Sequence, residues 1–107
     1  NKIGSLAVVI AARARNIPVY CFSTLLKFDP RPDTTALIET RDPKEIWSDA
    51  PPNLTMYAPA FDYTPYSSHI HVVCEAGTIQ GNMVKQTALQ QYPFINYDES
   101  LPSLSVA

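Results

Sequence analysis

The stretch NKIGSLAVVIAARARNIPVYCF, residues 1–22, decides the fold class because it predicts a helix followed directly by a strand. Apolar side chains recur at helical spacing at Ile3, Leu6 and Ile10, and other apolar residues fill the remaining faces. This pattern predicts an almost wholly buried helix over residues 3–15. Helix and strand in close succession are typical of α/β proteins.

Residues 19–22 are apolar without interruption, a pattern typical of a strand buried on both faces of a parallel sheet. Asn16 and Pro18 are expected to end the preceding helix. In an α/β fold, a buried helix normally follows a strand along the chain, so we expect a strand to lie upstream of Asn1. The predicted fold is therefore α/β, a Rossmann-like parallel sheet with helices on both faces, incomplete at its first strand.

Ten prolines against three glycines predict short elements separated by turns. Asp29 to Pro32 is expected to be a loop. Two short strands are expected, at 36–39 and 54–57. A helix is expected to start at Asp42–Pro43, with Glu45 as reciprocal cap, and another to run from Thr64–Pro65 to Cys74, closed by Gly77. The last expected helix covers 82–92, capped by Asn82 and ended by Pro93. We expect residues 1–81 to be a partial Rossmann-like domain and residues 82–107 to be a C-terminal helix and tail.

The chain carries a net charge of −2 and is 46% apolar, which argues against direct nucleic-acid binding and against a membrane surface. No apolar run approaches the length of a membrane span, and no secretory signal is evident, so a cytoplasmic protein is expected. Cys21 and Cys74 form no motif, which favours two reduced, buried thiols.

Three residues predict an anion site. Asn1 and Lys2 stand at a helix N-terminus, where free amides and the helix dipole favour a phosphate, although a solvated Asn-Lys pair is the plainer alternative. Lys27 follows the strand at 19–22 and so lies at the same sheet edge, unless it is an ordinary loop lysine. Asp62 either orients a sugar hydroxyl or accepts hydrogen bonds from loop amides.

Five motifs occur in the order that one known family shows. They are NKIGS at 1–5, LKFDPR at 26–31, ETRDPKE at 39–45, PAFDYTP at 59–65 and EAGTI at 75–79. They resemble the family of ribose-1,5-bisphosphate isomerase, methylthioribose-1-phosphate isomerase and the alpha, beta and delta regulatory subunits of the exchange factor for translation initiation factor two. Arg31 and the segment 39–45 are closer to the ribose-1,5-bisphosphate isomerase branch.

The resemblance implies that Asn1, Lys2 and Lys27 bind a sugar phosphate, in an isomerase-like protein that needs no cofactor. It also implies a catalytic cysteine and aspartate upstream of Asn1, so no catalytic residue is expected in this chain. Whether the protein is an enzyme is left open at this point, because a regulatory subunit that binds metabolites would share the motifs. The implied partners are a phosphorylated sugar and either further copies of the chain or related subunits.

Two other groups of residues are expected to be structural. His69 and His71 would lie on different sides of the predicted helix, and His71 with Cys74 would have no third ligand, so no metal site is expected. Trp47 and Tyr57 are expected to be core or subunit-interface aromatics, and Cys21 to be part of the core.

Overall fold

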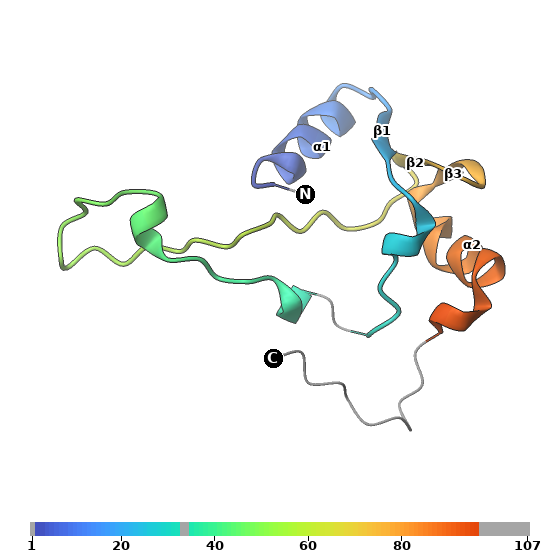
Figure 1. Cartoon of the computed structure of the whole chain (residues 1–107). Helices are drawn as coiled ribbons and strands as arrows, with labels where there is room; N and C mark the ends of the chain where they lie inside the picture. Colours follow the sequence, from blue (N-terminus) through green and yellow to red (C-terminus); the bar gives the residue numbers. More distant parts are fainter. Residues whose placement is uncertain (1, 33–34, 97–107) are drawn as a thin grey trace.

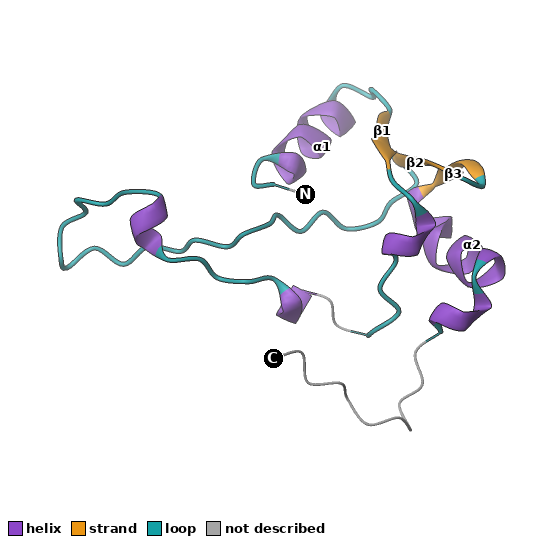
Figure 2. Cartoon of the chain, in the orientation of Figure 1, coloured by secondary structure: helices purple, strands orange, loops and turns teal. Residues whose placement is uncertain are grey.

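The computed structural model describes residues 2–32 and 35–96, which include a three-stranded sheet (Figures 1 and 2). The strands β1 (Val19–Phe22), β2 (Ile70–Cys74) and β3 (Gly77–Gln80) lie side by side in that order. Strands β1 and β2 are parallel, whereas β2 and β3 are antiparallel. The α/β class is confirmed, with a mixed sheet, because β3 turns straight back along β2.

Helix α1 (Ser5–Ala14) precedes β1, as the sequence predicts. Asn16 adopts a left-handed conformation with φ of 55°, which ends the helix before the chain enters β1. The predicted burial is wrong: no residue of α1 is buried, and Val8 is 64% exposed. Strand β1 alternates between half-buried and exposed residues instead of being covered on both faces. The core of the described chain lies on the other side of the sheet, so α1 has little to pack against.

The core lies between the sheet, the turn after β1 and helix α2 (Val84–Gln91). Its buried residues are Leu25, Val72, Val84 and Ala88, and half-buried Phe28, Cys74, Ile79, Tyr92 and Ile95 pack against them. The predicted final helix is confirmed, but its predicted cap is wrong. A 3-10 turn, η4 (Gly81–Met83), leads into α2, and no side chain caps the helix start.

A long connection, residues 23–69, joins the two parallel strands and extends far from the sheet (Figure 1). It contains the 3-10 turns η1 (Leu25–Lys27), η2 (Thr35–Leu37) and η3 (Pro43–Glu45). The predicted strands at 36–39 and 54–57 are wrong, since the first segment begins as η2 and the second has no regular structure. Among the described residues of this connecting arm, an isolated antiparallel bridge joins Thr40 and Pro59.

The predicted start of η3 is confirmed in part. Asp42 accepts a hydrogen bond from the amide of Lys44 and caps the turn, with Pro43 as its first residue. Glu45 does not cap in return, because its carboxylate binds the guanidinium of Arg41 at 2.7 Å. That ion pair lowers the pKa of Glu45 and raises the pKa of Arg41.

The predicted helix from Thr64–Pro65 to Cys74 is wrong, because its second half is strand β2. Ile70 and Val72 are buried while His71 between them is half-buried, which is the alternation of a strand. The edge of β1 supplies a full set of backbone partners, and branched side chains suit that setting. Gly77 does adopt a left-handed conformation, with φ of 99°, but it does so in the β2–β3 hairpin and not at a helix end.

The two cysteines and two aromatic residues can be compared with the surroundings that the sequence predicts for them. Cys21 and Cys74 are both free thiols, but each is half-buried and not buried as expected. Trp47 and Tyr57 are exposed on the long connection and lie outside the described core. Within residues 2–32 and 35–96, no helix is long and apolar enough to cross a membrane.

Candidate anion-binding site

The turn that opens α1 carries the first candidate cation. Gly4 is the residue before the helix. Its φ of 112° is a conformation that glycine adopts without steric cost. The carbonyl of Lys2 accepts hydrogen bonds from both the amide and the hydroxyl of Ser5, which fixes the turn. The side chain of Lys2 is exposed. Asn1 lies outside the described residues.

Asp62 supplies the cap of α1 from a distant part of the chain. Its Oδ2 atom accepts hydrogen bonds from the amides of Gly4, at 3.2 Å, and of Leu6, at 2.8 Å. A carboxylate at this position satisfies amides that have no partner within the helix. Of the two roles considered for Asp62, the structure shows the hydrogen bonds to amides. A contact with a sugar hydroxyl stays a prediction.

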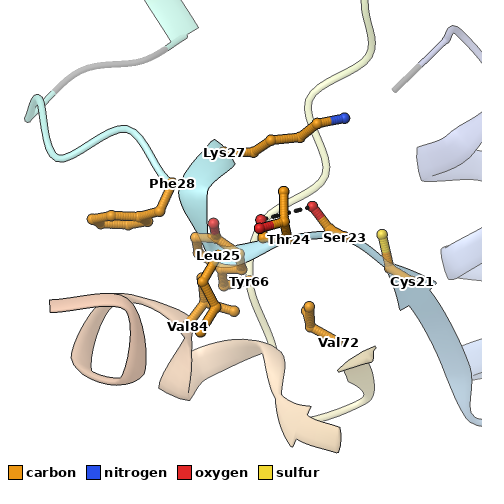
Figure 3. A pocket seen from close by; sticks show the side chains of 9 residues that line it. All are labelled: Cys21, Ser23, Thr24, Leu25, Lys27, Phe28, Tyr66, Val72 and Val84. Carbon is orange, nitrogen blue, oxygen red and sulfur yellow. Dashed lines mark hydrogen bonds between the residues drawn. The ribbon is translucent and has the colours of Figure 1, made fainter. Parts of the chain in front are cut away.

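Lys27 lies in η1, directly after β1. Thr24 caps this turn, and the amide of Lys27 donates a hydrogen bond to the Thr24 carbonyl. The Lys27 side chain is extended and points away from Phe28 (Figure 3). A small, mostly apolar pocket of about 150 Å³ borders Lys27 and reaches from Cys21 to Val84. The structure therefore places one cation at the mouth of a pocket at the strand end.

A wider groove of about 480 Å³ continues from Lys27 on the outside of η1. Lys85 from α2 and Arg31 from the loop after η1 contribute two further positive charges to its lining. Arg31 forms an ion pair with Asp29, and the hydrogen bond from its guanidinium lowers the pKa of the Asp29 carboxyl. Cationic side chains outnumber acidic ones along this groove, so its charge favours anions.

The N-terminus of α1 and Lys27 lie at the same edge of the sheet. Helix α1 runs back along the direction of β1, so its first residues are near the level at which β1 ends (Figure 1). Because β1 and β2 are parallel, this is the carboxyl edge where α/β proteins bind ligands. Lys2, Asp62 and Lys27 are thus contributed by three separate segments to one edge.

Glu75 is a residue of this edge that the sequence did not single out as functional. It follows the last residue of β2, and its carboxylate accepts hydrogen bonds from the Thr24 hydroxyl at 2.5 Å and from the Leu25 amide at 2.6 Å. The hydrogen bond from the Thr24 hydroxyl, followed by that from the Leu25 amide, stabilises the charged carboxylate and lowers the pKa of Glu75. Its position in the EAGTI motif was a signal in the sequence that could have singled it out. Its contact with Leu25, fifty positions earlier, depends on the fold.

The two histidines lie in strand β2 and in the turn that precedes it. His71 lies in β2, and its ring stacks on that of Tyr20 in β1 with centroids 5.0 Å apart. His69 lies in the turn before β2. Among the described residues no three or more His, Cys, Asp or Glu side chains gather in a way that could hold a metal ion.

The fold and this edge define a class: α/β proteins with positively charged turns at the carboxyl ends of parallel strands. The chain belongs to the Initiation factor 2 subunit family, whose family model matches residues 1–81. This membership confirms the resemblance that the five motifs indicate.

Known relatives are isomerases. The chain is 35% identical over 95 residues to the methylthioribose-1-phosphate isomerase of Bacillus cytotoxicus, covering 82% of this chain and 27% of that protein. It is 38% identical over 93 residues to the enzyme of the same name from Nostoc punctiforme, covering 79% and 26%. The chain thus spans about a quarter of the length of these relatives.

A solved structure has a similar fold. The crystal structure of 5-methylthioribose 1-phosphate isomerase from Pyrococcus horikoshii OT3 matches with a TM-score of 0.66 and 24% sequence identity. The match covers 85% of this chain and 28% of that one. At this identity the likeness bears on the fold, which agrees with the α/β class.

Proposed function

We propose that this chain is the sugar-phosphate-binding part of an aldose–ketose isomerase of the methylthioribose-1-phosphate isomerase type. The observation that carries the proposal is that the α1 N-terminus and the turn with Lys27 lie toward the same, carboxyl end of a parallel strand pair. The relatives, which are methylthioribose-1-phosphate isomerases, support this reaction class.

In this proposal Asn1, Lys2 and Lys27 hold the phosphate of the sugar. The ammonium groups and the first amides of α1 supply positive charge where a phosphate dianion needs it. Asp62 binds two of those amides and so holds the turn in place, and contact with a sugar hydroxyl is a second possible role. No cofactor or metal takes part.

The chemical step needs groups beyond this chain. Isomerisation of a sugar phosphorylated at C1 requires ring opening and transfer of hydrogen between C1 and C2, so an acid–base partner is required. The family resemblance implies that a cysteine and an aspartate upstream of Asn1 supply it. The residues described here bind and orient the substrate.

The relatives change the branch within the proposal. Arg31 and segment 39–45 favoured ribose-1,5-bisphosphate isomerase, whereas the relatives found carry the methylthioribose-1-phosphate name. In the structure, Arg31 is engaged by Asp29, and Arg41 pairs with Glu39 and Glu45 within segment 39–45. Three charges of the segment thus have a structural role in the arm, which weakens the segment as a signal for a bisphosphate.

We further propose a cytoplasmic protein that assembles with copies of itself or with related subunits. Its domain boundary would lie near residue 81, with 1–81 as part of a C-terminal Rossmann-like domain and 82–107 as helix and tail. The family match ends at the same residue. Residues 97–107 lie outside those that the structure describes.

Titration of the full-length protein with methylthioribose 1-phosphate tests the site. Lys27→Met and Lys2→Met each remove one ammonium group and are expected to weaken binding by about tenfold or more, since a charge-assisted hydrogen bond contributes roughly 1.5–3 kcal/mol. Lys44→Met, on the distant arm, is the matched control and should bind as the natural protein does. Unchanged affinity in both site variants would disprove the proposed phosphate contacts.

Turnover distinguishes the enzyme from the regulatory alternative. Conversion of methylthioribose 1-phosphate into its ketose by the full-length protein, followed by NMR, supports the isomerase. Binding of the sugar phosphate without turnover would instead support a regulatory module that senses metabolites within a nucleotide-exchange assembly.

A further inference from the structure

Glu75 connects the end of β2 to the turn that carries Lys27. Both of its carboxylate oxygens are used: Oε2 accepts from the Thr24 hydroxyl at 2.5 Å, and Oε1 accepts from the Leu25 amide at 2.6 Å. These bonds join residues that are 51 and 50 positions apart. Charge-assisted hydrogen bonds of this length are among the stronger ones in proteins.

The same bonds determine where η1 begins. The Thr24 Oγ1 atom donates to Glu75 and accepts from the amide of Leu26, so one hydroxyl joins the carboxylate to the first turn. The Thr24 carbonyl then accepts the amide of Lys27 at 3.2 Å. The path from Glu75 to Lys27 therefore consists of two hydrogen bonds joined through Thr24, and the bond from the Leu26 amide braces the same residue.

Leu25 anchors the turn from the other side. Its side chain is only 2% exposed and packs in the core with Val72 and Val84. Lys27 is two residues later in the same 3-10 turn, so its Cα position follows from the hydroxyl–carboxylate contact and from this buried side chain together. Its side chain extends beyond these contacts, away from the turn (Figure 3).

We propose that Glu75 is a positioning residue for the sugar-phosphate site, which acts through Thr24 to hold Lys27 at the carboxyl edge of β1. This inference rests on the proposed function. Glu75 is not a ligand here: a carboxylate would repel a phosphate, and its two oxygens are occupied by the donors of the turn. The positive ends of the hydroxyl and amide dipoles compensate the negative charge of Glu75 at this edge.

A double-mutant cycle on the full-length protein tests the proposal, with methylthioribose 1-phosphate as the probe and calorimetric Kd as the readout. Glu75→Gln removes the negative charge and replaces one accepting oxygen with an amide nitrogen, so the charge-assisted bonds to the turn become weaker neutral ones. We expect it to weaken binding about tenfold. In a Lys27→Met background the same substitution should change Kd less than twofold, because nothing remains to be positioned.

Control variants separate positioning from general damage. Glu39→Gln, an exposed Glu-to-Gln change on the arm, should leave Kd unchanged. Thr24→Val, which removes the hydroxyl, should reproduce the loss of Glu75→Gln, and Thr24→Ser, which keeps it, should restore binding. These Thr24 variants also test the proposal if Glu75→Gln does not fold.

The possible results point to different conclusions. A tenfold loss that disappears without Lys27 supports the positioning role. An equal loss with and without Lys27, or no loss in Glu75→Gln while Lys27→Met binds weakly, overturns it and leaves the proposed function intact. Full affinity in Lys27→Met would disprove the phosphate role of Lys27 and, with it, the positioning role.

Discussion

At the scale of single residues, two acidic side chains determine how the candidate site is built. Asp62 binds amides at the start of α1, and Glu75 binds the turn after β1. Each carboxylate holds a segment that carries a candidate lysine, Lys2 in one case and Lys27 in the other. The two acidic residues thus hold the two turns from which these lysines extend.

Removal of the Asp62 carboxylate tests its role as a cap. Asp62→Ala leaves the amides of Gly4 and Leu6 without their partner, and we expect it to cost about 1–2 kcal/mol of unfolding free energy, as other cap deletions do. Asp62→Asn keeps an acceptor oxygen and should lose less. Chemical denaturation of the full-length protein measures both.

The matched control for this change is Asp49→Ala. Asp49 is exposed on the long connection, and within the described residues no hydrogen bond or ion pair is recorded for it. It should unfold like the natural protein. Equal stability of the Asp62→Ala and Asp49→Ala proteins would show that the remote cap contributes nothing.

At the scale of elements, the hairpin β2–β3 and its exit into α2 contain a close backbone approach at Gly81. Gly81 is buried at the start of η4, and a Cβ atom built there would lie 2.8 Å from the carbonyl oxygen of Ser67 and 3.1 Å from that of Ile70. Both neighbours are backbone atoms and cannot rotate away. The close approach joins the exit of β3 to the entry of β2.

Gly81→Ala should therefore separate η4 from the start of β2. We expect a loss of about 1–3 kcal/mol, the usual cost of overpacking, seen as a lower Tm in the full-length protein. Gln80→Ala, one residue earlier and exposed, is the control and should melt with the natural protein. A Tm for Gly81→Ala equal to that of the control would show that the backbone accommodates the methyl group without cost.

At the scale of the whole chain, apolar side chains lie on the surface in unusual number. Those in and beside α1 and β1 that are more than half exposed are Ile3, Val8, Ile10, Ile17, Tyr20 and Phe22. Extensive exposed apolar surface is uncommon in soluble monomers and usually marks a contact surface. The chain also covers only about a quarter of its relatives' length, so other parts of a longer protein would suit this surface.

The 107-residue chain, produced by itself, is therefore expected to self-associate or to melt at low temperature. Burial of exposed apolar surface favours association by roughly 25 cal/mol per Å². Analytical ultracentrifugation and thermal unfolding measure both properties, with the full-length protein as the reference. A monomer that unfolds cooperatively at high temperature would contradict this expectation.

The amino-acid sequence alone determined the elements whose signals are local. The helix at Ser5–Ala14, the strand at Val19–Phe22, and the helix at Val84–Gln91 follow from periodicity, capping and proline. The five motifs likewise identified the family that the comparisons confirm. The binding roles of Asn1, Lys2 and Lys27 stay predictions.

Only the tertiary structure decided what depends on contacts between distant segments. Residues 70–74 fit a helical stripe as well as a strand, and the open edge of β1 resolves this ambiguity by supplying backbone partners. Asp62 and Glu75 reach donors more than forty-five positions away, which no local pattern encodes. The physical reason is that hydrogen-bond partners, remote caps and burial are properties of the folded arrangement, whereas helix periodicity and proline breaks are properties of neighbouring residues.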